Sequence, residues 1–257
     1  MDRIRQVRLS SVVLPLRQAI SDAKVLTGRQ RPMTEVVFLF AEIATDQDQH
    51  GIGFSYSKRA GGPAQYAHAK EIAGNLIGED PSDIGKVYDK LLWAGASVGR
   101  SGVATQAIAA IDIALWDLKA KRAGLPLAKL LGAHRDSVRA YNTSGGFLHA
   151  PIDEVLENAS KSLADGIGGI TPFLKLATLA DHNGLQLAPH FAMEIHLHLA
   201  AAYPREPWVE HFEWLNPLFN ERLETVDGRM LVPDRPGLGF TTSEQCARWT
   251  VDSCEFT

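Results

Sequence analysis

The chain has 257 residues, of which 45% are hydrophobic and 22% charged, and its formal net charge at pH 7 is -4. This length allows one large domain or two modest ones, each with a buried core. The slight negative charge gives no electrostatic reason to expect a nucleic acid or an anionic membrane as a partner.

Two further features bear on the compartment. Cys246 and Cys254 are too few to form a disulfide framework, so we expect free thiols in a reducing environment. The N-terminal sequence has no apolar core of signal-peptide length, and the apolar run at 36–41 is ended by Glu42, far short of a membrane span. A cytoplasmic protein is therefore expected.

The first part of the chain predicts strands. Residues 4–14 are rich in Ile, Val and Leu and predict a first strand. Residues 15–34 predict a mobile loop, long enough to act as a lid. Residues 35–45 and 52–57 predict the two strands of a hairpin that turns at 46–51.

Three helices are predicted next, over residues 64–77, 82–95 and about 103–123. In the third helix apolar residues recur at intervals of three and four, which predicts one buried stripe. Gly124 and Pro126 end this helix. Residues 1–125 therefore predict an α+β unit.

Beyond residue 136 the pattern alternates between strand and helix, which predicts a parallel sheet. Thr171-Pro172 is a strong helix start, with a capping residue before a proline. The predicted strands cover 137–143, 185–188 and 208–214, and the predicted helices cover 152–164, 171–182 and 193–202.

Several long segments resemble the mandelate racemase group of the enolase superfamily, and within it the acid-sugar dehydratases of the talarate/galactarate type. They occur in the family's order and span most of the chain. The segments are SVGRSG (97–102), AIAAIDIALWDLKAKRAGLPLAKLLG (107–132), YNTSGGF (141–147), LAPHFAMEIHLHLAAAYP (187–204), PWVEHFEWLNPLF (207–219) and RPGLGF (235–240).

The resemblance implies an α/β fold in which a capping domain, residues 1–125, covers a (β/α) barrel of the TIM type, residues 126–257. From Ser137 to Phe240 there are only 104 residues (240 − 137 + 1), whereas even a small complete barrel takes about 200. We therefore expect an incomplete barrel of about four βα units, with a deletion junction near residues 170–171.

The resemblance also implies a chemistry. The family removes the proton next to a carboxylate, and Mg²⁺ held by carboxylates stabilises the resulting enediolate. The substrate would be a dicarboxylate acid sugar that then loses its β-hydroxyl. The loops at 15–34 and 54–62 would close over it.

Candidate site residues follow from the same motifs. His190, after the apolar segment LQLAP, matches the histidine acid or base of the family. Glu210, in WVEHF, matches a glutamate that contacts the substrate carboxylate. Each residue also has a plain structural interpretation, as a hydrogen-bonded histidine and an exposed strand carboxylate.

Substrate binding is expected from two further pairs. Tyr141 and Asn142 end the first barrel strand and would face the substrate. Lys58 and Arg59, on the capping loop, would meet a carboxylate, although a basic pair is often only solvated.

Other parts of the family's machinery are missing from the sequence. Where the family has a Lys-x-Lys strand, Ile170 is followed by Thr171-Pro172, and Lys175 falls in a helix pattern. The aspartate that would partner His190 is absent. No acid between residues 137 and 190 follows an apolar strand, so no metal ligand is assigned; these acids are Asp153, Glu154, Glu157, Asp165 and Asp181.

Three functional hypotheses stay open. The chain is a member of a dehydratase lineage that is inactive because the metal carboxylates and the lysines are absent. Alternatively, it is a non-catalytic binding or assembly module, and open strand edges predict self-association. The third is a zinc site on His190, Glu194 and His198, which share one face if a helix begins at His190.

Overall fold

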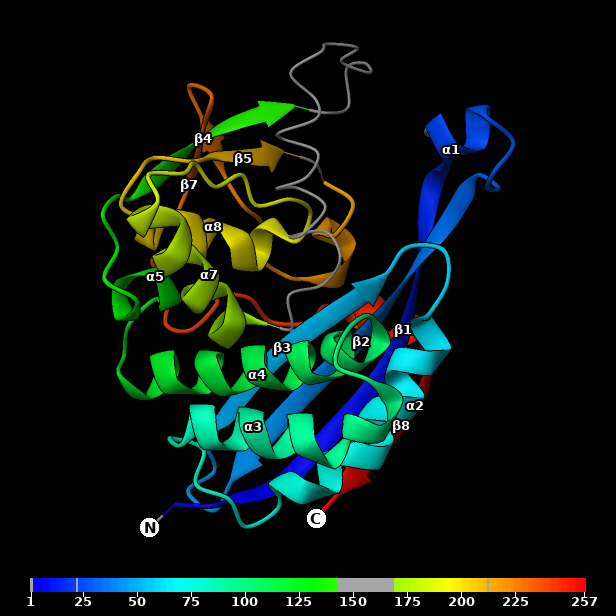
Figure 1. The fold of residues 1–257 in the computed structure, drawn as a ribbon, viewed down its shortest axis with the longest axis vertical. Helices are drawn as coiled ribbons and strands as arrows, with labels where there is room; N and C mark the ends of the chain where they lie inside the picture. Colours follow the sequence, from blue (N-terminus) through cyan, green and yellow to red (C-terminus); the bar gives the residue numbers. More distant parts are fainter. Residues whose placement is uncertain (1, 22, 143–168, 212) are drawn as a thin grey trace.

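The computed structural model describes residues 2–21, 23–142, 169–211 and 213–257, and it contains two open sheets with their covering helices (Figure 1). The first sheet has the strand order β3-β2-β1-β8, and all neighbouring strands in it are antiparallel. Its strands are β1 (Ile4–Ile20), β2 (Met33–Thr45), β3 (His50–Ser57) and β8 (Thr250–Phe256).

Three helices cover one face of this sheet: α2 (Gly62–Ala73), α3 (Ile84–Ala94) and α4 (Val103–Arg122). The longest of them, α4, lies so close to β3 that a Cβ atom at Gly51 or Gly53 would collide with carbonyl oxygens of α4. Glycine at these two positions therefore allows the helix to pack directly on the strand. The predicted hairpin and the three predicted helices are confirmed.

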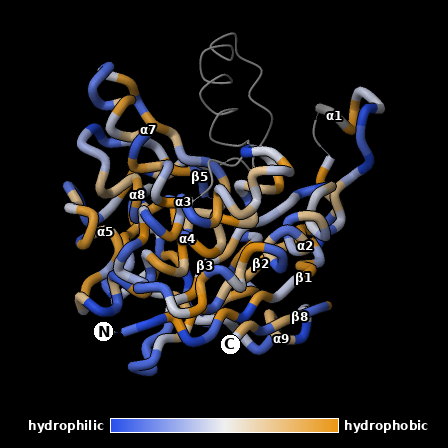
Figure 2. Tube along the Cα trace, turned by 60° about the horizontal axis from the view of Figure 1, so that its bottom comes forward, coloured by the Kyte–Doolittle hydropathy of each residue, from blue (hydrophilic) through white to orange (hydrophobic). Residues whose placement is uncertain are grey.

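The opposite face of the first sheet is aromatic and packs against the second part of the chain. The rings of Phe54 and Phe219 lie 5.5 Å apart, and those of Phe219 and Phe240 lie 5.3 Å apart. Both contacts belong to one hydrophobic core that spans the two parts. Figure 2 shows the hydrophobic residues concentrated along β1, β2 and β3.

The second sheet has the order β5-β4-β7-β6 and, within the described ranges, does not close on itself. In the described part of this sheet β4 and β5 pair in parallel, whereas β7 pairs antiparallel with β4 and β6. The prediction of a parallel sheet was therefore wrong for β6 and β7. Its strands are β4 (Ser137–Asn142), β5 (Trp208–His211), β6 (Thr225–Val226) and β7 (Arg229–Leu231). The prediction of an α+β cap followed by an incomplete α/β barrel is confirmed.

The second sheet is accompanied by two longer helices, α7 (Ile170–His182) and α8 (Met193–Ala202). The shorter elements are α1 (Ala23–Leu26), η1 (Gly74–Leu76), η2 (Ala96–Val98), α5 (Leu127–Leu130), η3 (Asn216–Leu218) and α9 (Glu244–Arg248). No helix in the described part of the chain is long and apolar enough to cross a membrane.

The prediction of a loop over residues 15–34 was wrong in its extent. β1 continues to Ile20 and β2 already begins at Met33, so the two strands form a projecting hairpin with α1 near its tip. Pro15 is tolerated because β8 pairs with β1 only as far as Val12. Beyond that point β1 is an edge on this side, where a missing N–H is harmless.

In the second part, one predicted strand is absent and another is shorter than predicted. Residues 185–188 form no strand, and Leu185 is exposed. The strand predicted over 208–214 ends at His211. The helix predicted over 152–164 lies outside the described residues.

The strand β8 was not predicted, and it changes the composition of the first sheet. Val7 pairs with Phe256 and Leu9 with Cys254, so the C-terminal strand joins the sheet of the cap. The proposed division into residues 1–125 and 126–257 stays a prediction. β8 belongs to the second segment in sequence but lies in the first sheet.

Candidate functional site

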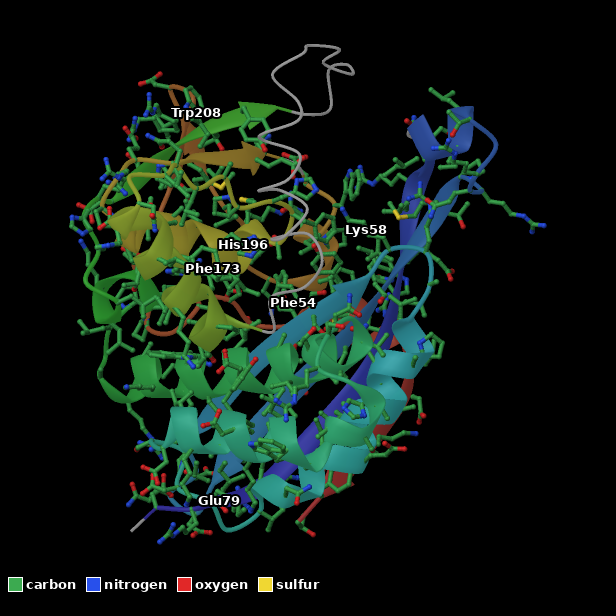
Figure 3. All side chains as sticks on the ribbon, in the orientation of Figure 1. Phe54, Lys58, Glu79, Phe173, His196 and Trp208 are labelled. Carbon is green, nitrogen blue, oxygen red and sulfur yellow. The ribbon has the colours of Figure 1, made fainter. Side chains whose placement is uncertain are left out.

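Three of the predicted site residues come together where the cap meets the second part of the chain. Lys58 directly follows β3 and lies on the side that faces the second part (Figure 3). Its Nζ lies 3.4 Å from Nε2 of His190. The other ring nitrogen of His190, Nδ1, pairs with Oε2 of Glu210. Side chains from the residue after β3, from the segment before α8 and from β5 thus form one cluster.

The cluster combines a buried and an accessible end. The side chain of Glu210 is 4% exposed, whereas that of His190 is 36% exposed. The ammonium group of Lys58 also lies over the ring of Phe191, 4.4 Å from its centre. A cation on an aromatic face gains electrostatic stabilisation from the ring. Lys58 is therefore held over the accessible edge of His190.

The backbone at Phe191 has an unusual conformation, with φ at 69°. For a bulky residue this left-handed region is strained. The Phe191 N–H donates a hydrogen bond of 3.1 Å to Oε2 of Glu210. Its ring packs 4.2 Å from that of Tyr56 and 5.8 Å from that of Trp214. These contacts hold the turn that presents His190.

Two tyrosines respond to the charge of Glu210. Tyr141 on β4 lies opposite Glu210 in the parallel register. Burial and the nearby Glu210 carboxylate raise the pKa of Tyr141 to about 12. Burial first, and Glu210 second, also raise the pKa of Tyr56. Both hydroxyl groups therefore stay protonated and able to donate hydrogen bonds.

The remaining predicted binding residues are not brought into this cluster in the same way. Asn142 pairs through its backbone with His211, and its side chain lies outside the described part. Arg59 donates from Nε to the carbonyl of Arg31, 3.3 Å away, in the projecting hairpin. The basic pair is thus divided, with only Lys58 directed at His190.

His196, on α8, is a further, partly buried histidine near the cluster that the sequence did not single out. Burial, followed by the proximity of His190, lowers the pKa of His196 to about 4. Its Nδ1 has no hydrogen-bond partner among the residues the structure describes, and its ring stacks on Phe173. A neutral, enclosed imidazole of this kind is suited to packing.

The zinc hypothesis is contradicted by the structure. α8 begins at Met193, so His190 is not on the helix that carries Glu194 and His198. Both ring nitrogens of His198 are occupied: Nδ1 accepts from the N–H of Ala128, and Nε2 lies 3.0 Å from the carbonyl of Leu238. Across the described ranges, no three His, Cys, Asp or Glu side chains lie close enough to hold a metal ion.

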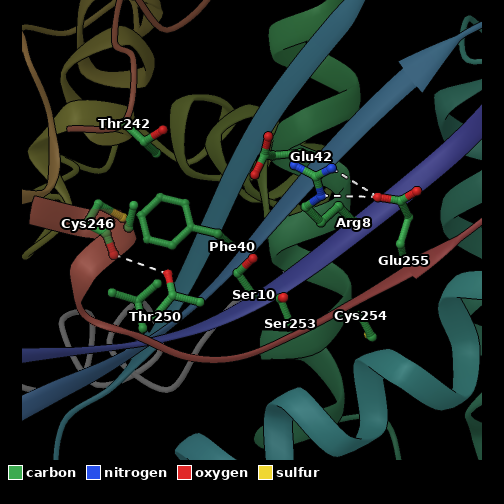
Figure 4. A pocket seen from close by; sticks show the side chains of 12 residues that line it. Arg8, Ser10, Phe40, Glu42, Thr242, Cys246, Thr250, Ser253, Cys254 and Glu255 are labelled. Carbon is green, nitrogen blue, oxygen red and sulfur yellow. Dashed lines mark hydrogen bonds and ion pairs between the residues drawn. The ribbon is translucent and has the colours of Figure 1, made fainter. Parts of the chain in front are cut away.

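A cavity of about 520 Å³ lies elsewhere, between the first sheet and α9 (Figure 4). Its charged residues include Arg8 and Glu255, which form an ion pair of 3.0 Å with each other. None of the cluster residues lines it. Its lining is Arg8, Ser10, Val12, Phe40, Glu42, Thr242, Cys246, Ala247, Thr250, Ser253, Cys254 and Glu255.

An α+β cap over an open part-barrel, with a histidine–carboxylate pair beside a barrel strand, defines a protein of the enolase type. Sequence matches follow the same two parts. Residues 27–132 match the N-terminal domain of mandelate racemase and muconate lactonizing enzymes, and residues 164–246 match the enolase C-terminal domain-like family. The chain belongs to the mandelate racemase/muconate lactonizing enzyme family of the enolase superfamily.

Individual relatives are acid-sugar dehydratases. The L-talarate/galactarate dehydratase of Salmonella typhimurium is 48% identical, over 99% of this chain and 93% of its own. Its structure liganded with Mg and L-lyxarohydroxamate superposes with a TM-score of 0.91, over 99% of this chain and 94% of that chain. L-talarate dehydratase from Polaromonas sp., complexed with Mg and L-glucarate, is 50% identical, covers 99% of both chains and gives 0.90.

The same alignment leaves many positions of the Salmonella enzyme unmatched. It extends over 369 positions, whereas this chain has 257 residues, so at least 112 positions (369 − 257) of the Salmonella enzyme face no residue here. Since nearly the whole of both chains is spanned, the missing positions are internal. This agrees with the prediction of a barrel that lacks its middle.

Proposed function

We propose that this chain, of acid-sugar dehydratase lineage, binds the carboxylate of an acid sugar at the cluster of Lys58, His190 and Glu210 but does not dehydrate it. The observation that carries the proposal is the approach of the Lys58 ammonium to Nε2 of His190. A cation from the cap and a histidine from the barrel part are thereby joined at one accessible edge. The dehydratase activity of the relatives supports the class of ligand.

The binding half of the proposal rests on charge and hydrogen bonding. The ammonium of Lys58 attracts a carboxylate, and a charge-assisted hydrogen bond is among the strong ones. The 36% exposed imidazole of His190 lies next to it and can exchange a hydrogen bond with a sugar hydroxyl. Tyr141, with its pKa raised to about 12, adds a protonated hydroxyl on the neighbouring strand.

The inactive half rests on what the reaction requires. Removal of a proton next to a carboxylate places a second negative charge on that group, which the superfamily stabilises with Mg²⁺. Mg²⁺ takes hard oxygen ligands, mainly carboxylates. The carboxylate of the cluster, Glu210, faces its own histidine and a backbone N–H. The residues described here therefore do not fit a magnesium site, and no step is assigned to a metal.

Sequence supports the same conclusion. The chain has no Lys-x-Lys segment after Ile170, and Lys175 is an exposed residue in the middle of α7. Of the acids considered between residues 137 and 190, Asp181 is on α7, where it pairs with Arg205. The others, Asp153, Glu154, Glu157 and Asp165, lie outside the described residues.

Titration calorimetry and an activity assay with galactarate test both halves together. We expect saturable heat of binding that persists in EDTA, and no heat with galactitol, which has the same carbon skeleton without carboxylates. In parallel, ¹H NMR in D₂O with added Mg²⁺ should show neither exchange of the proton next to the carboxylate nor a dehydrated product.

The two halves fail separately. Exchange or product formation above the rate without protein would show that the chain is an active dehydratase. Equal heats for galactarate and galactitol would show that the cluster is not a carboxylate site.

A second candidate function, an assembly module that pairs with another copy of this chain, is favoured by one surface. Leu176 and Leu179 on α7, with Leu185 just beyond its end, are exposed apolar residues on one segment. In the described part of the second sheet, β5 and β6 each have a strand on one side only. Open edges and apolar helix faces both promote association.

A further inference from the structure

Glu210 is a buried carboxylate whose Oε2 serves two donors. It accepts from the N–H of Phe191 at 3.1 Å and pairs with Nδ1 of His190. A buried charge is costly unless it is paired and hydrogen-bonded. Both donors come from the same turn, two consecutive residues before α8. Glu210 therefore fixes the turn and the ring together.

The strained residue in that turn supports this interpretation. A positive φ for a bulky side chain persists only where the surroundings determine it, and φ of Phe191 is 69°. The hydrogen bond to Glu210 and the ring contacts with Tyr56 and Trp214 hold Phe191 in this conformation. The result is an imidazole with Nδ1 directed to Glu210 and Nε2 directed to the cap.

Contacts at the two ring nitrogens require the same tautomer. A carboxylate can only accept, so Nδ1 of His190 must carry the proton it shares with Glu210. An ammonium group can only donate, so Nε2 must hold the lone pair that faces Lys58, 3.4 Å away. In a histidine, the hydrogen bond at one nitrogen sets the chemistry of the other.

We propose that Glu210 is a positioning residue that keeps the proton of His190 on Nδ1 and leaves the lone pair of Nε2 facing Lys58 and the ligand. The motif had predicted a substrate contact for Glu210 and no carboxylate partner for His190. In this chain one glutamate, on β5, supplies the partner that the missing aspartate would have been. The proposal rests on the proposed function, in which the lone pair of Nε2 can accept a hydrogen bond from a sugar hydroxyl.

The tautomer is measured on the whole chain without ligand, so the outcome does not depend on whether an acid sugar binds. ¹H–¹⁵N long-range correlation spectra of the ¹⁵N-labelled protein at about pH 9, where imidazoles are neutral, distinguish a protonated ring nitrogen from one with a lone pair. His190→Gln identifies the His190 signals. We expect a protonated Nδ1 and an unprotonated Nε2.

Two variants test the role of Glu210. Glu210→Ala removes the acceptor, and we expect the Nδ1 signal to lose at least half of its protonated character. Glu213→Ala is the matched control, because it removes an exposed carboxylate three residues further along the chain and keeps Glu210; its spectrum should match the parent. If Glu210→Ala does not fold, Glu210→Asp, whose shorter side chain withdraws the carboxylate, is expected to show the same loss in part.

Two results for the His190 ring would contradict the proposal. A parent chain with its proton on Nε2 would overturn the proposal without any variant. An unchanged Nδ1 signal in a folded Glu210→Ala or Glu210→Asp protein would overturn it as well, because another group would then hold the ring.

Discussion

Lys58 and Arg59 are adjacent and carry the same charge, yet their partners differ. Lys58 lies 3.4 Å from His190, whereas Arg59 donates to the carbonyl of Arg31 in the cap hairpin. Their sequence context predicted the pair as one binding feature. Only the geometry after β3 separates the residue aimed at the cluster from its neighbour.

This difference gives a prediction for binding. Lys58→Met should weaken the affinity for galactarate roughly tenfold to a hundredfold, the loss expected for one charge-assisted hydrogen bond. Arg59→Met should leave the affinity within about twofold. Titration calorimetry in EDTA measures both, and equal losses in the two variants would contradict the separate roles.

At this scale the sequence motifs located residues but not their contacts. His190 and Glu210 were found because LAPHF and WVEHF match the family, and they do meet. Their pairing could not be predicted, since it depends on the left-handed turn at Phe191, and no local sequence rule places a phenylalanine at φ 69°. Tyr56 and Trp214 support that turn from distant elements and carry no sequence signal of their own.

Among the elements, α4 and α7 show how one helix starts against another. α7 has Gly169 at its N-cap and no capping side chain of its own. Instead, Asp112 on α4 accepts from the N–H of Thr171 at 2.9 Å and from its hydroxyl. Trp116 donates to the same hydroxyl. Burial of Asp112 nevertheless raises the pKa of its carboxyl to about 7, although the Thr171 bonds oppose the shift.

The raised pKa makes this contact sensitive to pH. An unfolded aspartate titrates near 3.8, so between about pH 4 and pH 7 the folded chain holds a proton that the unfolded chain has lost. The contribution to stability is complete below about pH 4 and is lost as the pH rises to about 7.

Asp112→Asn isolates this effect, because the amide cannot titrate. From pH 5 to pH 7.5, the free energy of unfolding of the parent should fall relative to that of the variant by roughly 1–3 kcal/mol. Urea titrations at each pH provide the measurement. Parallel curves would show that the carboxyl is not the titrating group, and contributions from Glu194 and His196 cancel because both proteins contain them.

The elements differ in how far they could be predicted. Thr171-Pro172 predicted a helix here, but α7 begins at Ile170 with Gly169 as its N-cap, so the capping role predicted for Thr171 was wrong. α4 followed from its apolar repeat, because that signal is local. The contact with Asp112 could not be predicted, since it joins residues 59 positions apart. The segment 185–188 resembled a strand in composition, but in the described structure no neighbouring strand pairs with it.

For the molecule as a whole, the incomplete barrel has consequences for association. The family resemblance, the missing motifs and the short length predicted it together, and the at least 112 unmatched positions of the Salmonella enzyme agree. Leu179 of α7 is a 59% exposed apolar residue. We expect the 28.0 kDa chain to elute above its monomer mass in size-exclusion chromatography with light scattering.

Leu179→Lys should shift that population toward monomer, because a charge at this position opposes its burial in an interface. Val251→Lys is the control, since Val251 is similarly exposed but lies on β8, in the other sheet. A parent chain that is monomeric at all concentrations and melts in one sharp transition would contradict the assembly function.

The pairing of β8 with β1 has a final consequence for biosynthesis. Val7 and Phe256 are opposite each other, although they are 249 positions (256 − 7) apart in the sequence. During translation, this side of β1 therefore stays unpaired until residues 250–256 of β8 have been synthesised. A chaperone that shields unpaired strand edges on the ribosome would therefore have to protect β1 for longer than the strands of the incomplete barrel.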